Sequence, residues 1–508
     1  YSMLESEKIV NGMVGMPRME STTVSKFMKR LEETSRNVPV FEGELYLELH
    51  RGTLTQMHDI KRSNRMLEKA IHNLEIVGIM SGAPKNEKLD KSLETLLTNQ
   101  FHDILPGTTI PEVNKVAIHQ NYSEIDALGG EIKKILGSDK SEGFVLCNTL
   151  SWERNGFITA DDNGKTPDGA VVQRYTDIEG KKKLAFSYGS QKGLSAVFVP
   201  FGKAKDAECP FTVDGDVITT PFATVTLRNG SITSLLTKDG FEVVRDSEKP
   251  LNTFYMGDDI PLLWDNWDID YDQQLKMKPV SGVLSSEIVS CGALQLRVRV
   301  KRKISGTSTL EQDIVFYSDT PRIDFETVMD WNESHKLLKV GFDVNVRCET
   351  ARHEIQFGNI KRPTHENYPT DKSQFEVSNH KWTDLSDNRF GAAILNDCKY
   401  GISVSGSDMR LTLHKAGCHP DPGGDRGRHT ATYSLLVHNC GFSTDAVIRP
   451  AYELNYPVIC VEGENTVLCS GEPMFTVSAE NVIIETVKYA EDGNGFVLRL
   501  YATEGSHA

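Results

Sequence analysis

The spacing of apolar residues changes at Gly137, and this change constrains the fold more than any other feature of the chain. Upstream of it, Ile60, Leu67 and Ile71 recur at the spacing of one helix face, whereas downstream apolar and polar residues alternate. A period near 3.6 residues is typical of amphipathic helices, and a period of two is typical of half-buried strands. The sequence therefore predicts a helical segment followed by β domains.

The helical segment, residues 55–138, is predicted to contain three helices joined by short links. Gly82 to Pro84 ends the first helix, and the second is expected over Glu87–Asp103. The third begins at Thr109 to Glu112, a capping box with proline inside the first turn, and continues to Gly137. Antiparallel helices with short links predict a small three-helix bundle.

Strand patterns fill the rest of the chain. Residues 294–301 alternate strictly between apolar and polar side chains, which predicts a half-buried strand. Asn229-Gly230 separates two strand-like runs and is typical of a hairpin turn. Many short strands with almost no helical signal favour antiparallel β-sandwiches. We expect a small β domain over residues 139–205 and a large β-sandwich over residues 206–508.

His102 and Asp103 stand side by side at the end of the second predicted helix. The apolar stripe of that helix runs from Leu89 to Phe101, and at about 100° per residue His102 projects nearly opposite its centre. The side chain then faces solvent or another domain. A neutral imidazole can ligate a metal, and a carboxylate can accept hydrogen bonds from sugar hydroxyls. The alternative is an exposed histidine that merely lies at a helix end.

Nine stretches of the chain, in order, resemble glycoside hydrolase family 38, the zinc-dependent retaining α-mannosidases. They are GELYLELHRGTLT (43–55), QFHDILPG (100–107), CNTLSWER (147–154), WDNWDID (264–270), TPRIDFETVMDW (320–331), HKLLKVGFDV (335–344), FGNIKRPTH (357–365), LNDCKYG (395–401) and DRGRHTATYSL (425–435). The resemblance covers nearly the whole chain. It implies that His102 is a zinc ligand and that Asp103 contacts the substrate sugar.

The resemblance also implies that parts of the active site lie outside this chain. In the family, an N-terminal α/β barrel supplies the catalytic nucleophile, the acid/base and a His-x-Asp pair that ligates zinc. The His-x-Asp found here, His419-Pro420-Asp421, lies far downstream in a Pro/Gly-rich segment that we interpret as a loop. We therefore expect a fragment cut at both ends, in which residues 1–54 are a remnant of the barrel. It holds no catalytic residue, and its zinc site is incomplete.

Five further residues are candidates for contacts with the substrate. His50 and Arg51 follow a predicted strand, residues 44–49, whose end faces the expected barrel. Trp264 and Asp265 place an indole beside a carboxylate, which suits a sugar; the alternative is a turn around a core tryptophan. Arg428 belongs to a charged, glycine-rich segment that either reaches an active site or is simply solvated.

Composition restricts the partners and the location of the protein. The net charge of −15 makes nucleic acids and anionic membranes poor partners. No apolar run approaches the ~20 residues that span a bilayer. The nine cysteines form no CxxC pair, and their odd number argues against a complete disulfide framework, so we expect a cytoplasmic protein.

The predicted fold is thus α+β and multidomain, with a barrel remnant, a three-helix bundle and antiparallel β-sandwich domains. The predicted function is part of a zinc-dependent retaining α-mannosidase that hydrolyses terminal α-mannosides of oligosaccharides. The partner is then a mannose-containing oligosaccharide, and the question of whether the protein forms a homo-oligomer stays open. The alternative is a non-catalytic carbohydrate-binding or scaffold protein made of these domains.

Overall fold

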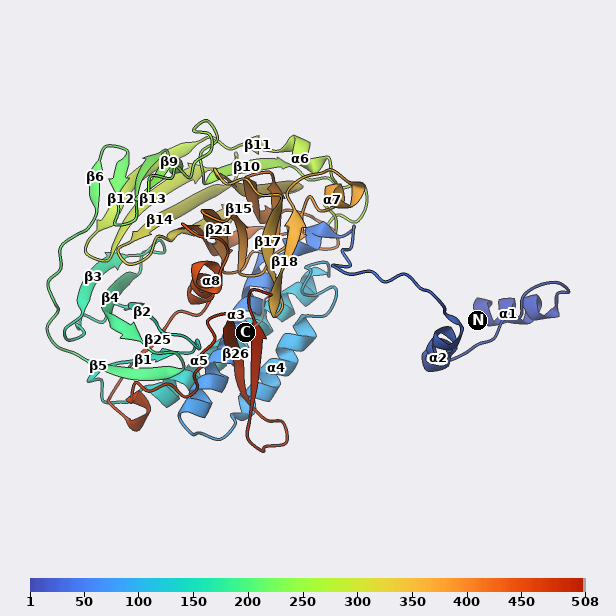
Figure 1. Ribbon diagram of the computed structural model, residues 1–508, viewed down its shortest axis with the longest axis horizontal. Coiled ribbons are helices and arrows are strands. Elements are labelled where there is room, and N and C mark those ends of the chain that lie inside the picture. Colours follow the sequence, from blue (N-terminus) through green and yellow to red (C-terminus); the bar gives the residue numbers. More distant parts are fainter. Residues whose placement is uncertain (506–508) are drawn as a thin grey trace. The chain divides into compact units, whose positions relative to one another are not determined.

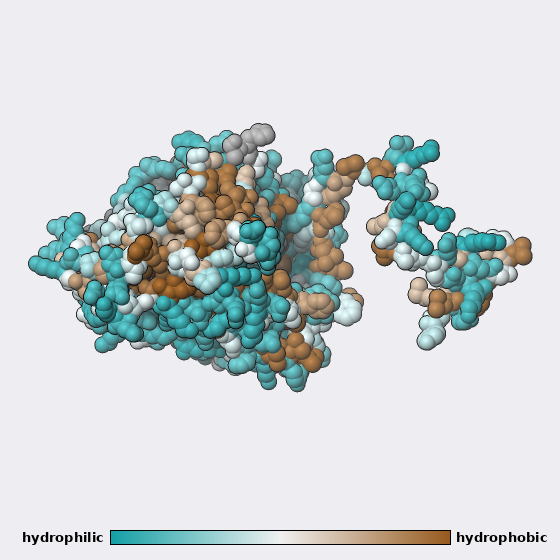
Figure 2. Space-filling view, turned by 90° about the horizontal axis from the view of Figure 1, so that it is seen from below, coloured by the Kyte–Doolittle hydropathy of each residue, from teal (hydrophilic) through white to brown (hydrophobic). Residues whose placement is uncertain are grey.

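The computed structural model describes residues 1–505, and the chain divides into two compact units with the boundary after Leu47. The first unit contains α1 (Ser2–Gly12) and α2 (Val24–Thr34), neither of which has a buried residue. Apolar side chains accordingly show as brown patches on this unit, at the right of Figure 2. The strand predicted over residues 44–49 is not formed, so that prediction is wrong.

The second unit begins with the three predicted helices, α3 (His58–Met80), α4 (Glu87–Asn99) and α5 (Pro111–Leu136), after a short 3-10 turn, η1 (Arg51–Leu54). The α4 helix ends four residues earlier than predicted. Its last residue, Asn99, turns its side-chain amide to Asn121 of α5 at 2.8 Å. Phe101, predicted on the apolar stripe, lies beyond the helix end and is exposed.

The helices bury one face against one another and the other against a small sheet. Leu67 and Leu74 of α3 and Leu128 of α5 form one apolar cluster with Val145 and Ala196 of that sheet. Removing apolar surface from water is the main force that holds such layers together. The bundle is therefore packed on the β region rather than separate from it.

Antiparallel sheets make up the rest of the second unit (Figure 1). The largest has nine strands in the order β12 (Val283–Cys291), β13 (Gln295–Lys303), β14 (Thr309–Tyr317), β15 (Ile323–Trp331), β24 (Gly427–His438), β21 (Gly391–Asn396), β20 (Trp382–Ser386), β17 (Thr350–Ile355) and β18 (Gly358–Pro363). A six-stranded sheet has the order β11 (Lys278–Pro279), β10 (Thr253–Asp258), β16 (Lys336–Asp343), β23 (Asp408–Lys415), β22 (Gly401–Ser405) and β19 (Val377–Ser378).

These two sheets pack face to face as a β-sandwich. Phe325 of β15 meets Phe342 of β16 across the layers, with ring centroids 5.7 Å apart, and also stacks on Tyr433 of β24 at 5.2 Å. All three rings are buried. The predicted α+β fold, a helical bundle followed by antiparallel sandwich domains, is confirmed.

Smaller sheets and helices complete the second unit. The sheets are β6–β9 (Thr212–Asp214, Val217–Thr219, Ala223–Arg228, Ser231–Thr237), β25-β1-β5 (Ile459–Gly463, Gly143–Asn148, Ser195–Pro200), β2-β4-β3 (Arg154–Asp161, Lys182–Gln191, Val171–Thr176) and the hairpin β26–β27 (Val482–Tyr489, Phe496–Ala502). The helices are α6 (Gln273–Lys276), α7 (Pro369–Ser373), α8 (Arg449–Asn455), η2 (Thr444–Ile448) and η3 (Val467–Cys469). Because β25 returns to pair with β1, the small β domain is not one continuous segment of the chain.

The predicted hairpin at Asn229-Gly230 is confirmed. It joins β8 to β9, and both turn residues have positive φ, 51° for Asn229 and 69° for Gly230. A two-residue turn of this kind matches the right-handed twist of the strands it joins.

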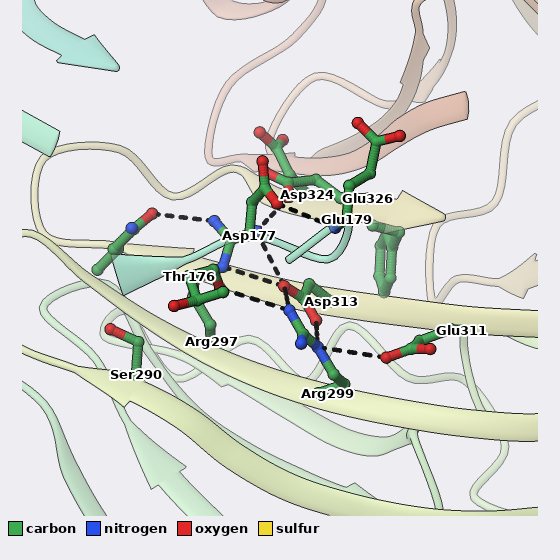
Figure 3. A network of polar contacts seen from close by, with 12 residues as sticks. Thr176, Asp177, Glu179, Ser290, Arg297, Arg299, Glu311, Asp313, Asp324 and Glu326 are labelled. Atoms are coloured by element: carbon green, nitrogen blue, oxygen red, sulfur yellow. Dashed lines mark hydrogen bonds and ion pairs between the residues drawn. The ribbon is translucent and has the colours of Figure 1, made fainter. Parts of the chain in front are cut away.

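The strand β13 differs from the half-buried strand that its alternation predicts. Its polar residue Arg297 is as buried as its apolar neighbours, because the sheet β2-β4-β3 covers the outer face of the large sheet. Arg297 bonds Asp313 at 3.1 Å and also contacts Glu326, while Arg299 bonds Asp313 at 2.7 Å (Figure 3). Buried charges persist only when they are paired in this way.

Candidate functional site

His102 and Asp103 lie in the turn that follows α4. The imidazole Nε2 is 3.7 Å from the Asp103 carboxylate, and the two side chains are 74% and 46% exposed. The hydroxyl of Thr108 donates to Asp103 Oδ1 at 2.8 Å, and the Thr108 amide donates to the Asp103 carbonyl at 3.1 Å. The turn therefore presents an imidazole and one carboxylate oxygen to the outside, on a backbone that is fixed from behind.

Side chains from two other segments fix this turn. Lys61 of α3 donates to the carbonyls of Leu105 at 3.0 Å and Pro106 at 3.1 Å. The amide of Asn266 donates to the carbonyl of Gly107 at 3.1 Å. Burial lowers the pKa of Lys61 to about 7. The His102–Asp103 turn is thus tied both to the helical bundle and to the loop that carries Trp264 and Asp265.

Gly107 closes the turn in a conformation and a space that exclude a side chain. Its φ is +78°, and a β-carbon at this position would lie 2.6 Å from the carbonyl oxygen of Gln56 and 2.6 Å from Cβ of Met57. Real β-carbons do not approach other atoms so closely. The turn can therefore pack directly on the start of α3 only because residue 107 is glycine.

His50 and Arg51 precede α3, and His50 contacts the same loop. The amide of His50 donates to Asp268 at 2.6 Å, and its ring Nδ1 lies 3.0 Å from that carboxylate. The amide of Gly52 donates to the carbonyl of Trp267 at 2.7 Å. Arg51 turns away, because its guanidinium donates to the Ser373 carbonyl at 2.6 Å.

In the loop between β10 and α6, Trp264 is exposed to solvent, whereas Asp265 bonds neighbouring segments of the protein. Trp264 is 60% exposed, so the predicted alternative of a core tryptophan is wrong for this residue. Asp265 Oδ2 lies 3.1 Å from His335 Nε2 and accepts from the amide of Cys418 at 2.7 Å. Its other oxygen, Oδ1, is buried without a partner. Asp265 therefore fixes its loop and keeps one acceptor free.

Arg428 lies apart from these residues. In β24 it neighbours His429, whose ring is buried, and successive side chains of a strand point to opposite faces. Arg428 instead lines a hollow of about 220 Å³ with Glu311 and Asp330. The structure thus brings His50, Trp264, Asp265, His102 and Asp103 onto connected loops, and Arg428 onto another face. The substrate contact predicted for Arg428 stays a prediction.

A second group of ligand-type side chains is buried where α3 meets β23 and β24. Within the described residues, two triplets have ligand atoms within 4.8 Å of one another: His58, Asp59 and His429, and His414, Asp425 and His429. The ammonium of Lys399 lies 2.6 Å from Nδ1 of His58, and Nε2 of His58 lies 3.0 Å from the Thr430 carbonyl. Both ring nitrogens of His58 are therefore engaged. We interpret this group as a hydrogen-bonded network, because a buried ammonium opposes a further cation.

His102 lies outside both triplets. Among the residues that the structure describes, no second and third ligand-type side chain joins it within that distance. Structural and catalytic zinc sites in proteins use at least three protein ligands. The described residues alone therefore do not fit a zinc ion at His102.

The side chains that hold this site together are not among the residues that the sequence predicts for it. Lys61 is an unremarkable lysine in a helix, and its bonds go to backbone carbonyls, which every residue offers. Asn266 and Asp268 belong to the WDNWDID stretch, in which only Trp264 and Asp265 are predicted to contact the substrate. The position of Asn266 between Trp264 and Trp267, with Asp268 directly after them, was the available signal, because Asn and Asp in turns commonly bond the backbone.

Comparison with known families identifies the class of domain. The helical segment, residues 48–136, matches the profile described as "Alpha mannosidase middle domain". Residues 218–423 match the profile described as "Glycosyl hydrolases family 38 C-terminal domain". These are domains of a glycoside hydrolase. The chain belongs to glycoside hydrolase family 38, as its nine sequence stretches predict.

Curated relatives are similar along the whole chain. Alpha-mannosidase 2C1 of Homo sapiens is 34% identical over 528 residues, which cover 100% of this chain and 49% of that protein. Alpha-mannosidase G of Dictyostelium discoideum is 30% identical over 562 residues, which cover 99% of this chain and 51% of that protein. The chain spans about half the length of the curated relatives that it matches.

Solved structures share the fold. The crystal structure of an alpha-mannosidase from Enterococcus faecalis V583 superposes with a TM-score of 0.79 at 16% identity, covering 99% of this chain and 69% of that chain. A second structure from Enterococcus faecalis, described as a protein in glycosyl hydrolase family 38, has a TM-score of 0.74. Within the described residues, no helix is long and apolar enough to cross a membrane.

Proposed function

We propose that this chain is part of a zinc-dependent α-mannosidase that hydrolyses terminal α-mannosides of oligosaccharides with retention of configuration. The observation that carries the proposal is the fixed turn at His102 and Asp103, in a chain whose middle and C-terminal domains belong to family 38. The names of the relatives, all alpha-mannosidases, support the substrate class.

Asp103 is the residue through which this chain would contact the sugar. One of its oxygens is bound by Thr108, which fixes the carboxylate while the other oxygen faces outward. A fixed carboxylate accepts hydrogen bonds from hydroxyls without reordering itself. Trp264 lies on the neighbouring loop, and His50 is bonded to that loop through Asp268. We propose that they add an aromatic face and an imidazole to the sugar-binding surface.

His102 would supply one zinc ligand, and the other ligands would come from residues beyond those described. In such enzymes a bound zinc supplies Lewis-acid polarisation or orientation of substrate oxygens. Because the described residues do not complete the metal site, the roles proposed for this chain are those of its own side chains. The nucleophile and the acid/base, two carboxyl groups in a retaining glycosidase, are likewise proposed to lie outside this chain.

A cytoplasmic location is part of the same proposal. All nine cysteines are free thiols, which is typical of a reducing compartment.

The experiment compares this chain with a longer natural product that contains it. The longer protein should cleave an aryl α-mannoside, release α-mannose first, as followed by NMR, and lose activity to a chelator. In it, Asp103→Asn should lower kcat/KM by the equivalent of about 1–3 kcal/mol, because the substituted side chain leaves substrate hydroxyls unpaired. Normal kcat/KM in Asp103→Asn would contradict the role of Asp103. Absence of turnover by the longer protein would favour a non-catalytic carbohydrate-binding protein.

A further inference from the structure

A cleft of about 730 Å³ opens between part of the helical bundle and part of the β domains. One wall is formed by α3 and α4, and the other by α8 and the hairpins β17–β18 and β26–β27. Figure 1 shows β26 beside α3, and these two elements are in contact. None of the predicted site residues lines this cleft. Its volume lies in the range of small-molecule sites.

Two polar side chains of α3 line the cleft without partners. Nε2 of His72 is buried and forms no hydrogen bond, while its ring lies 4.6 Å from the ring of Tyr456. Glu75, one helical turn further, has no hydrogen bond or ion pair among the described residues, and burial raises its pKa to about 7. Burial lowers the pKa of His72 to about 4, so its ring is neutral. An unpaired buried polar atom such as Nε2 of His72 costs free energy that a ligand can recover.

The charges that line the cleft nearly cancel. Six carboxylates face five cations: Glu68, Glu75, Asp90, Glu354, Glu485 and Glu491 against Arg65, Lys85, Lys381, Lys488 and Arg499. Neither an anion nor a cation is therefore favoured. Both hydrogen-bond donors and acceptors line the cleft, and hydroxyl groups, which both donate and accept, match such a surface.

An aromatic ring stands at the rim. Phe357 lines the cleft, is 56% exposed and occupies the turn of the β17–β18 hairpin with φ of +53°. Positive φ is uncommon for a bulky residue, and backbone strain of this kind clusters at functional sites. The ring of Tyr501 meets Phe357 edge-on at 6.1 Å and fixes its direction. An exposed, fixed ring is a platform for the apolar face of a sugar.

We propose that this cleft binds a neutral oligosaccharide, with the Phe357 ring stacked on one sugar and His72 and Glu75 hydrogen-bonded to neighbouring hydroxyls. Nε2–H of His72 would donate to a hydroxyl oxygen, and the Glu75 carboxylate would accept from a hydroxyl. Since His72 and Glu75 are one turn apart on α3, one sugar ring can engage both. That the sugar is mannose rests on the proposed function, whereas the existence of the site does not.

The test is calorimetric titration of the 508-residue chain with an α-linked mannotriose. We expect saturable binding with a stoichiometry near one, weakened at least tenfold by Phe357→Asn. Asparagine tolerates positive φ, so this variant removes the ring and keeps the turn. The matched control is Tyr368→Asn, which removes an exposed aromatic side chain that does not line the cleft and should leave binding unchanged. Glu75→Gln should also weaken binding, because an amide replaces the acceptor carboxylate.

Asp103→Asn separates this site from the one at His102 and Asp103. The cleft proposal requires that mannotriose binding survives Asp103→Asn and is lost in Phe357→Asn. The reverse pattern overturns it, and so does the absence of binding for both mannotriose and maltotriose. Binding of maltotriose alone, lost in Phe357→Asn, supports the cleft while contradicting mannose as its sugar. If the longer protein shows no catalysis but mannotriose still binds this chain, the proposed function fails and the cleft proposal stands.

Discussion

Replacing Gly107 with alanine should destabilise the turn that carries His102 and Asp103. The left-handed backbone at φ of +78° costs an L-residue about 1–2 kcal/mol. The new β-carbon would also lie 2.6 Å from Cβ of Met57, and crowding of this kind costs about 1–3 kcal/mol. The two effects together predict a loss of about 2–5 kcal/mol in the free energy of unfolding of the helical bundle.

Gly82→Ala is the matched control for the backbone effect. Gly82 follows α3 with φ of +67°, and a β-carbon there meets nothing within 4 Å. Its substitution should therefore cost only the conformational part, about 1–2 kcal/mol. The difference between the two variants isolates the close approach of the turn to the start of α3.

Urea unfolding followed by circular dichroism at 222 nm, which reports the helices, measures both losses. In the longer protein, Gly107→Ala should also lower kcat/KM, because the turn must move to relieve the contact, whereas Gly82→Ala should not. Equal destabilisation by the two substitutions would refute the reasoning, since it would mean that the crowding at Gly107 has no energetic consequence.

Three other outcomes are expected. In the longer protein, His102→Ala should lower zinc content and activity together, and unchanged zinc by elemental analysis would contradict the role of His102 as a ligand. In this chain the same substitution should barely change the melting temperature, because the side chain is 74% exposed. Asp268→Ala should leave His50 without its partner and raise KM more than it lowers kcat, as steady-state kinetics would report. Glu75→Gln should stabilise the chain at pH 8, by at most about 3 kcal/mol. Because burial raises the pKa of Glu75 to about 7, the wild type is fully stable below the unfolded pKa near 4.5 and loses stability as the pH rises through 7. The gain from glutamine should therefore disappear at pH 4, and a pH-independent gain in denaturation midpoints would contradict this cause.

The fold could be predicted where local patterns decide it. The α5 helix begins at the proline that the sequence places in its first turn and ends at Leu136, with Gly137 as its cap. The predicted capping box is not formed, because Ile110 is the N-cap and no side chain caps the helix. The turn Asn229-Gly230 needs positive φ at both residues, which only a few residue types supply readily. In both cases the chemistry that fixes the backbone is carried by adjacent residues, so a single sequence contains it.

The predictions fail where a segment distant in the sequence determines the local structure. The alternation of apolar and polar residues in β13 predicts one solvent-exposed face. Arg297 is nevertheless buried, because another sheet covers that face and Asp313 neutralises the charge. Apolar spacing followed by Pro106-Gly107 predicts that α4 extends to Asp103. Asn99 instead turns to Asn121 of α5, a partner that spacing within α4 cannot reveal.

The reactive groups of the site could be predicted from the sequence, whereas the side chains that hold them in position could not. His102 and Asp103 could be recognised because a reactive imidazole and a carboxylate are visible in the sequence as residue types. What gives them a fixed position is a set of bonds from Lys61 and Asn266 to carbonyls of the turn. A carbonyl is common to all residues, so no pattern of residue types marks it as the acceptor of a particular lysine or asparagine. A site of this kind is therefore predicted from its reactive groups, whereas the rigidity on which its activity depends becomes visible only when the loops of separate domains are seen in contact.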